Sequence, residues 1–300
     1  MNKYLNSIVF FFLFSVKLFS QITIKGFIKD SKTKASLAFA TVQFQYAKNG
    51  LYTNEEGYFE ISSNNKKDTL IVSYLSYEEK KIPVSQLNSS SDNIIFLTNS
   101  TVNLSEVIVK GRKHKSKGFM FGHYDFPTTF NWGSGPAYIF MNYYKNTTAS
   151  NPIIKKLYFD FGKAIKTTHK SLIRVRVMVR ESEVGEPTKD VIQENMIVEV
   201  KPFTSKLIYD IEKYNIAFPS KGIFIGVEII GVYRKGELTL FGFKNHALYV
   251  NETQDSKRIR VGEAWNYSPF DRKWFTNYKK GYNRMWKFGM ELEDLEDEDK

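Results

Sequence analysis

Residues 49–77 read NGLYTNEEGYFEISSNNKKDTLIVSYLSY, which is the clearest structural signal in the chain. Asn49-Gly50 can adopt the positive φ angles of a tight hairpin turn, and Gly57 ends the polar loop that follows. Apolar residues then recur with the period of two that a strand with one buried face requires: Phe59 and Ile61, then Leu70, Val72 and Tyr74. The stretch predicts strands from two β-sheets that pack together.

Two parts of this stretch also resemble a known family. Residues 53–59, TNEEGYF, are similar to the T-(N/D)-x-x-G-x-F core of the carboxypeptidase regulatory-like domain, and residues 72–77, VSYLSY, are similar to its V-S-Y-x-G-Y strand. The resemblance implies a transthyretin-like β-sandwich that is not itself catalytic. It also implies an exported protein of Bacteroidetes-type bacteria, where this module precedes TonB-dependent receptors and other envelope proteins.

The flanking residues extend the same module. Four further strands are predicted from alternating or short apolar runs bounded by polar loops: 22–29, 40–47, 80–84 and 93–97. The second of these runs directly into Asn49-Gly50, so we expect a hairpin there. Residues 104–111, LSEVIVKG, resemble the segment that closes the module in receptor-type members. The expected regulatory-like sandwich therefore spans residues 21–111.

Residues 1–20 are expected to form a secretory signal peptide. Lys3 precedes an apolar run at 8–14, and the small residue Ser20 ends the segment. The sequence contains no cysteine, so it predicts neither disulfides nor a lipid-bearing cysteine. We expect an exported protein that is periplasmic, outer-membrane-associated or secreted.

The net charge of +11 is unevenly distributed, because residues 293–300 form an acidic tail and the body of the chain is correspondingly more basic. Charge of one sign steers partners towards a surface without specifying them. We therefore expect electrostatic contact with an anionic envelope surface. A nucleic-acid partner is not expected for an exported protein.

A second domain is predicted after a basic linker at 112–118, RKHKSKG. Strand patterns occur at 157–161, 173–180, 196–200, 206–211 and 286–292, and residues 222–232 are apolar on both faces, as in a central strand. In 173–180, apolar residues alternate with Arg174, Arg176 and Arg180, so this strand is expected to have one buried and one solvated face. Residues 132–136, WGSGP, are expected to form a loop. The fold class is thus all-β, with a jelly-roll-like antiparallel sandwich at 119–292. A small outer-membrane barrel remains an alternative.

No catalytic, cofactor-binding or metal site is predicted. His114, His123, His169 and His246 all lack the His-x-x-Glu spacing of a metallocarboxypeptidase. A serine nucleophile elbow is also missing, since no glycine lies two residues before Ser134. Six carboxylates are available without a spacing that selects a catalytic pair: Asp125, Asp160, Glu181, Glu228, Glu263 and Asp271.

Aromatic and polar residues are interleaved in residues 263–275, in a loop-like setting. The favoured interpretation is that Trp265 and Trp274 pack over one end of the sandwich, and the alternative is a ligand platform made by Trp265, Tyr267 and Trp274. Glu228 is a separate oddity, since it is a carboxylate in an apolar strand and an unpaired buried charge is costly. We expect it to pair with Arg174 or Arg176.

The leading hypothesis is an exported, non-enzymatic cell-envelope protein that binds a glycan or an outer-membrane protein partner. The alternative is an enzymatic or hydrolase-associated β-sandwich. It is suggested only by the kinds of protein in which the regulatory-like module occurs. A small outer-membrane barrel is the third possibility.

Overall fold

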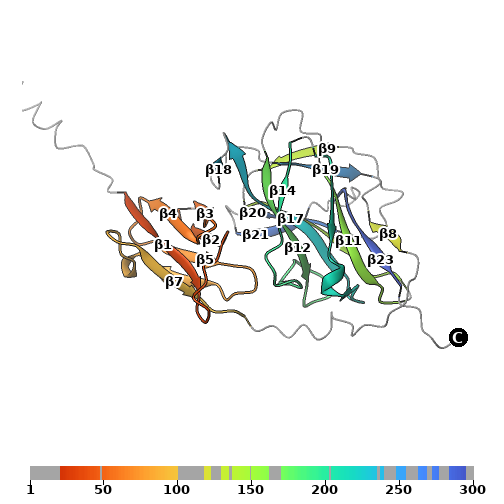
Figure 1. Ribbon diagram of the computed structural model, residues 1–300, viewed down its shortest axis with the longest axis horizontal. Coiled ribbons are helices and arrows are strands. Elements are labelled where there is room, and N and C mark those ends of the chain that lie inside the picture. The colour runs from red at the N-terminus through yellow and green to blue at the C-terminus, as the bar shows by residue number, and fades with distance from the viewer. Residues whose placement is uncertain are drawn as a thin grey trace, which may run out of the picture.

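A computed structural model describes most of the chain as β-structure (Figure 1). The described residues are 21–47, 49–100, 118–122, 130–134, 137–148, 150–161, 170–202, 204–234, 237–239, 248–254, 263–268, 272–276 and 284–294. The predicted signal peptide, most of the basic linker and most of the acidic tail lie outside these ranges. Within them there are strands and two short 3₁₀ turns, and no helix has the length and apolarity of a membrane span.

The N-terminal body is a sandwich of two sheets. One sheet has the order β4-β1-β7 and the other the order β3-β2-β5-β6. The strands are β1 (Ile22–Asp30), β2 (Thr41–Phe44), β3 (Gly50–Tyr52), β4 (Tyr58–Ser63), β5 (Thr69–Ser73), β6 (Lys80–Pro83) and β7 (Asn93–Leu97). The predicted alternation is confirmed, because Phe59 and Ile61 of one sheet and Leu70 and Val72 of the other share one buried core.

Close approach of backbones explains two glycines in this sandwich. A Cβ on Gly26 would lie 2.0 Å from the carbonyl oxygen of Asn93 in β7, so β1 and β7 can pair here only around a glycine. Gly50 corrects the predicted tight turn: it is the first residue of β3, opposite Gln43, and its φ is not positive. The hairpin exists, but its turn includes residues 45–47 instead. A Cβ at position 50 would lie 2.7 Å from Gln43 Cβ, and this close approach explains the glycine.

The C-terminal body contains two larger antiparallel sheets that pack on one apolar core. The first sheet runs β13-β12-β17-β10-β20-β21, and β14 and β18 pair at its margin. Its strands are β10 (Ile139–Tyr144), β12 (Ser171–Val179), β13 (Lys189–Asp190), β14 (Ile197–Val200), β17 (Ile223–Arg234), β18 (Glu237–Thr239), β20 (Glu263–Ser268) and β21 (Lys273–Thr276). The predicted central position of residues 222–232 is confirmed, because β17 lies between β12 and β10.

The second sheet runs β15-β11-β23-β8 and covers the inner face of the first. It comprises β8 (Phe119–Gly122), β11 (Ile153–Asp160), β15 (Lys206–Asp210), β16 (Ile216–Ala217), which pairs with β11, and β23 (Phe288–Glu293). The chain crosses repeatedly between the two sheets, as in a jelly roll. The all-β class and the antiparallel sandwich are therefore confirmed.

Two local predictions in this body were wrong. Trp132–Ser134 were expected in a loop, but they belong to β9 (Phe130–Ser134), which pairs with β19 (Leu248–Gln254), and β19 pairs also with β22 (Arg284–Trp286). The face of β12 that carries arginines was expected to be solvated. Arg174 and Arg180 are instead buried, because other parts of the chain cover this outer face of the first sheet.

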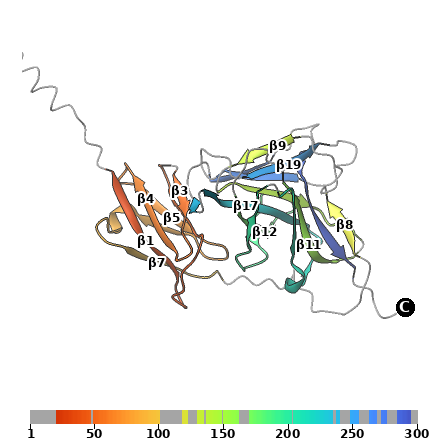
Figure 2. The ribbon, with the colours of Figure 1, turned by 45° about the horizontal axis from the view of Figure 1, so that its top comes forward.

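The two bodies lie next to each other along the long axis of the molecule in both views (Figures 1 and 2). Their contact is made by the sheet β3-β2-β5-β6 of the N-terminal body and the outer face of the first C-terminal sheet. This outer face carries the candidate site.

Candidate functional site on the outer sheet face

Strand register places the predicted site residues in one line across the outer face. Arg174 of β12 lies opposite Glu228 of β17, and Glu228 lies opposite Ile139 of β10. The line continues from Ile139 to Tyr267 of β20 and from there to Trp274 of β21. Because directly opposed residues point to the same side of a sheet, a charged pair and two aromatic rings share one row.

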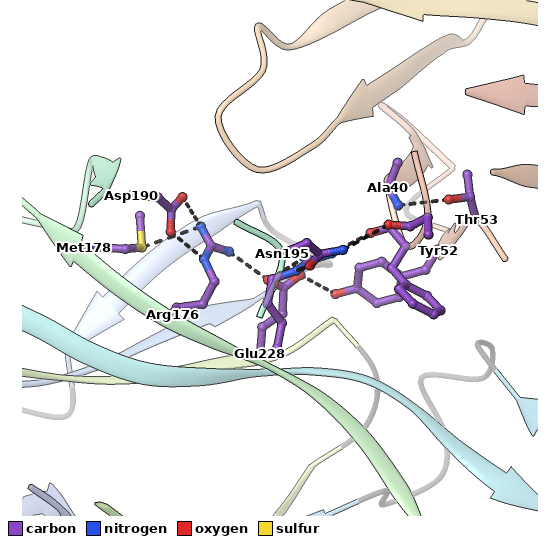
Figure 3. A network of polar contacts seen from close by, with 11 residues as sticks. Ala40, Tyr52, Thr53, Arg176, Met178, Asp190, Asn195 and Glu228 are labelled. Atoms are coloured by element: carbon purple, nitrogen blue, oxygen red, sulfur yellow. Dashed lines mark hydrogen bonds and ion pairs between the residues drawn. The ribbon is translucent and has the colours of Figure 1, made fainter. Parts of the chain in front are cut away.

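Glu228 is the centre of a buried charged network (Figure 3). Its Oε2 lies 2.9 Å from Arg174 Nη1 and accepts a hydrogen bond of 2.7 Å from Arg176 Nη1. Arg176 also donates two parallel hydrogen bonds to the Asp190 carboxylate, one of 2.7 Å from Nε and one of 2.6 Å from Nη2. The prediction that Glu228 pairs with Arg174 or Arg176 is confirmed, and it pairs with both. Its charge is thereby compensated at a site that is only 3% exposed.

The N-terminal body completes this network. The hydroxyl of Tyr52, in β3, donates a 2.7 Å hydrogen bond to Oε1 of Glu228 (Figure 3). Arg174 Nη2 donates to the carbonyl oxygen of Phe39 at 2.8 Å, and its Nε donates to Asn195 Oδ1 at 2.6 Å. Around these bonds, Phe39 and Tyr52 pack in an apolar cluster against Leu172 and Ile230. The contact between the two bodies is thus both apolar and charged.

The network controls the ionisation of Glu228. Burial by itself raises the pKa of its carboxyl, but the positive charges of Arg174 and Arg176 and the hydrogen bond from Tyr52 outweigh burial and lower the pKa to about 2. The ordinary value is 4.5, so the folded protein holds this carboxylate ionised far more strongly than the unfolded chain.

A pH dependence of stability follows from this difference. A depressed folded-state pKa contributes stability that is complete above the unfolded pKa and is lost as the pH falls towards the folded value. The stability difference between the native protein and Glu228→Gln is therefore expected to shrink between about pH 5 and pH 2. Urea unfolding of both proteins across this range measures it. A difference that stays constant with pH would mean that Glu228 is not held ionised by the network.

The three predicted platform residues are brought together on the same face. Tyr267 and Trp274 are cross-strand neighbours with ring centroids 5.4 Å apart at an interplanar angle of 61°, and Trp265 lies two residues before Tyr267. All three are partly buried against a small cluster that includes Met141 and Phe224. The loop-like setting was wrong, since residues 263–268 and 273–276 are strands of a hairpin. The packing and platform interpretations describe the same rings, because each keeps an accessible part.

Polar side chains flank the platform at both ends. At one end, Glu263 accepts a 2.8 Å hydrogen bond from the indole N–H of Trp265 and lies 3.3 Å from Arg180 Nη1. The Arg180 guanidinium stacks 3.7 Å from the ring centroid of Tyr143. At the other end, Arg272 forms a 2.7 Å ion pair with Glu79 of the N-terminal body. Aromatic faces between charged groups suit a ligand that has apolar faces and hydroxyl edges.

Of the remaining sequence candidates, those that the structure describes do not converge on a common site. Asp160 pairs with Lys287 in the C-terminal body, and Glu181 is exposed just after β12. Asp125, Asp271 and the four histidines, His114, His123, His169 and His246, lie outside the described residues. Within the described ranges, no group of three or more acidic, histidine or cysteine side chains is arranged to hold a metal ion.

The family model described as CarboxypepD_reg-like domain matches residues 24–109. The N-terminal sandwich is a carboxypeptidase regulatory-like domain. This family is non-catalytic and has the transthyretin-like sandwich architecture, so the recognition made from residues 53–59 and 72–77 is confirmed. No curated protein matches the chain. The C-terminal body must therefore be interpreted from its own geometry.

Sequence reasoning missed the part of the site that the regulatory-like domain supplies. Tyr52 and Glu79 of this domain, and Asp190 and Arg272 of the C-terminal body, were not singled out. One signal for Tyr52 was present: Leu51 belongs to the core of the domain, so its neighbour Tyr52 points to the opposite face of the sheet. This signal was insufficient by itself, because single exposed aromatic residues are common on protein surfaces.

Proposed function

We propose that this protein is an exported, non-catalytic binding protein of the cell envelope, and that it holds a glycan against the platform of Trp265, Tyr267 and Trp274. The observation that carries the proposal is the placement of these rings. They share one sheet face, remain partly exposed and lie between the Arg180–Glu263 and Arg272–Glu79 pairs.

The chemistry of a sugar ring matches this surface. A pyranose has an apolar face of C–H groups and a rim of hydroxyl groups. The apolar face stacks on aromatic rings, and the rim exchanges hydrogen bonds with charged groups beside them. Glu263 and Arg272 can serve as acceptor and donor for that rim. Binding needs no bond to be broken, which agrees with a non-catalytic role.

Two sequence properties support an envelope location. Residues 1–20 have the pattern of a secretory signal, and the net charge of +11 favours contact with an anionic surface. The regulatory-like domain adds an architecture that is common in exported proteins of Bacteroidetes-type bacteria.

A glycan array probed with the native protein, Trp265→Ala and Trp274→Ala tests the proposal. We expect specific signals for the native protein and an affinity loss of about tenfold or more in each variant, because a central aromatic anchor carries much of the binding energy. Phe275→Ala is the matched control. Phe275 is an exposed aromatic residue of the same strand β21, but it points to the opposite face and should leave binding unchanged.

Three outcomes would contradict glycan binding at this platform. The first is an array without signals above those of the heat-denatured protein. The second is equal loss of binding in Phe275→Ala and Trp274→Ala. The third is recovery of a single envelope protein in a pulldown with no glycan signal, which would assign the platform to a protein partner. Release of reducing sugars or cleaved peptide by the native protein would favour the hydrolase alternative instead.

A further inference from the structure

At least four hydrogen bonds or ion pairs between described residues join the regulatory-like domain to the outer sheet face, and they extend from the network to the platform. Three surround the charged network: Tyr52 to Glu228, Arg174 to the carbonyl oxygen of Phe39, and Asn195 Nδ2 to the carbonyl oxygen of Ala38 at 3.3 Å. The fourth, between Arg272 and Glu79, lies at the start of β21, next to the aromatic platform. The domain therefore contacts the face both at the network and beside Trp274.

Two of these contacts involve strained backbone. Phe39 has a φ of 60° and Arg272 a φ of 53°, and both values lie in the left-handed region that bulky residues seldom adopt. Such conformations persist only where the surrounding contacts determine them strongly. The carbonyl oxygen of Phe39 is fixed by Arg174, and the guanidinium of Arg272 is fixed by Glu79. Strain at both residues thus coincides with contact between the bodies.

Arg272 connects the regulatory-like domain to the platform itself. Arg272 forms the ion pair with Glu79 and lies two residues before Trp274, next to the strand that pairs with Tyr267. Burial raises the pKa of Tyr267, and the positive charge of Arg272 acts in the opposite direction. Tyr267 in turn packs edge-on against Trp274. The position of these two rings depends on a residue that the regulatory-like domain holds in place.

We propose that the regulatory-like domain is a fixed part of the binding face: its docking through Tyr52, Phe39 and Glu79 sets the positions of Tyr267 and Trp274. The domain is then a positioning element of the site and not a tethered module that moves independently. The inference rests on the proposed function for the meaning of the platform, but its test requires no ligand.

The docked arrangement can be measured by the distance between two spin labels. The chain contains no cysteine, so labels attach only at introduced sites. Ile94→Cys in β7 and Val184→Cys between β12 and β13 place one label on each body at residues that are 59% and 75% exposed. We expect one narrow distance distribution in this background. In Tyr52→Ala its width should increase about twofold or more, because domains without a firm interface move relative to each other.

Tyr46→Ala is the matched control for this measurement. Tyr46 belongs to the turn between β2 and β3 but is 63% exposed, so its loss should leave the distribution narrow. Tyr52→Phe is a milder variant that keeps the ring and loses only the hydrogen bond to Glu228. It should broaden the distribution less than Tyr52→Ala. Circular dichroism spectra that match the native protein show that each variant is folded.

The effect on the platform is measured by ¹⁹F NMR of the protein labelled with 5-fluorotryptophan. Each signal is assigned by a Trp→Phe substitution. We expect the Trp274 signal to shift in Tyr52→Ala and in Glu79→Gln, and to stay unchanged in Tyr46→Ala. The signal of buried Trp286 should stay unchanged in all three. A broad distance distribution in the native protein would overturn the proposal. So would an unshifted Trp274 signal in the combined variant Tyr52→Ala/Glu79→Gln.

Failure of this inference and failure of glycan binding are distinguishable. A mobile domain with array signals that depend on Trp274 would leave the platform as a site of the C-terminal body alone. A fixed domain with no array signals would support the docked arrangement and contradict glycan binding.

Discussion

Replacement of Glu228 by glutamine should lower the free energy of unfolding by about 3–5 kcal/mol, the usual cost of breaking a buried ion pair from one side. The carboxylate accepts bonds from Arg174, Arg176 and Tyr52 in a site that is almost fully buried. The neutral amide keeps the shape but leaves two guanidinium groups with less compensating charge. Urea unfolding at neutral pH, followed by far-ultraviolet circular dichroism, measures the loss.

Glu199→Gln is the control for this prediction. Glu199 also pairs with a cation, Lys170 at 2.6 Å, but its side chain is 48% exposed. Exposed ion pairs contribute about 0–1 kcal/mol, so this variant should be close to native. Equal losses in the two variants would contradict the view that burial makes the Glu228 network important.

The second large effect is expected at Trp286. The side chain is 1% exposed, and its ring packs edge-on against Phe140 with centroids 4.8 Å apart. The buried side chain of Asn142 bonds both the amide and the carbonyl group of Trp286, where strand pairing stops between β22 and β23. Trp286→Ala leaves a large cavity in the core and should cost about 3–5 kcal/mol.

Phe275→Ala provides a matched comparison for Trp286→Ala in the same denaturation experiment. Phe275 is an aromatic residue of the same body, but it is 45% exposed and should change stability by less than about 0.5 kcal/mol. A loss below about 1 kcal/mol in Trp286→Ala would contradict the assignment of Trp286 to the core.

The sequence predicts the regulatory-like domain well because its signals are local. Alternation at Phe59 and Ile61, the glycine at 57 and the resemblance of residues 53–59 all depend on short-range chemistry. The same holds for the central strand at 222–232, since a run that is apolar on both faces must be covered on both sides. The need to compensate a buried charge also predicted the arginine partners of Glu228.

The composite site could not be predicted in the same way. Tyr52 and Glu228 are separated by 176 positions in the sequence, and no pattern within either strand encodes their contact. The arginine face of β12 was expected to be solvated for the same reason, because strand alternation identifies two faces but not what packs on them. Residues 263–275 were placed in a loop because aromatic and polar residues are mixed there, although Trp265 and Tyr267 obey strand alternation.

The central claim is that the regulatory-like domain and the C-terminal sheet are joined through the Glu228 network. A double-mutant cycle of Tyr52→Phe and Glu228→Gln, measured by urea unfolding, tests it most directly. A hydrogen bond to a buried charge predicts a coupling energy of about 1.5–3 kcal/mol between these two residues. Additive effects, with a coupling energy near zero, would show that Tyr52 and Glu228 do not interact and would contradict the joined arrangement.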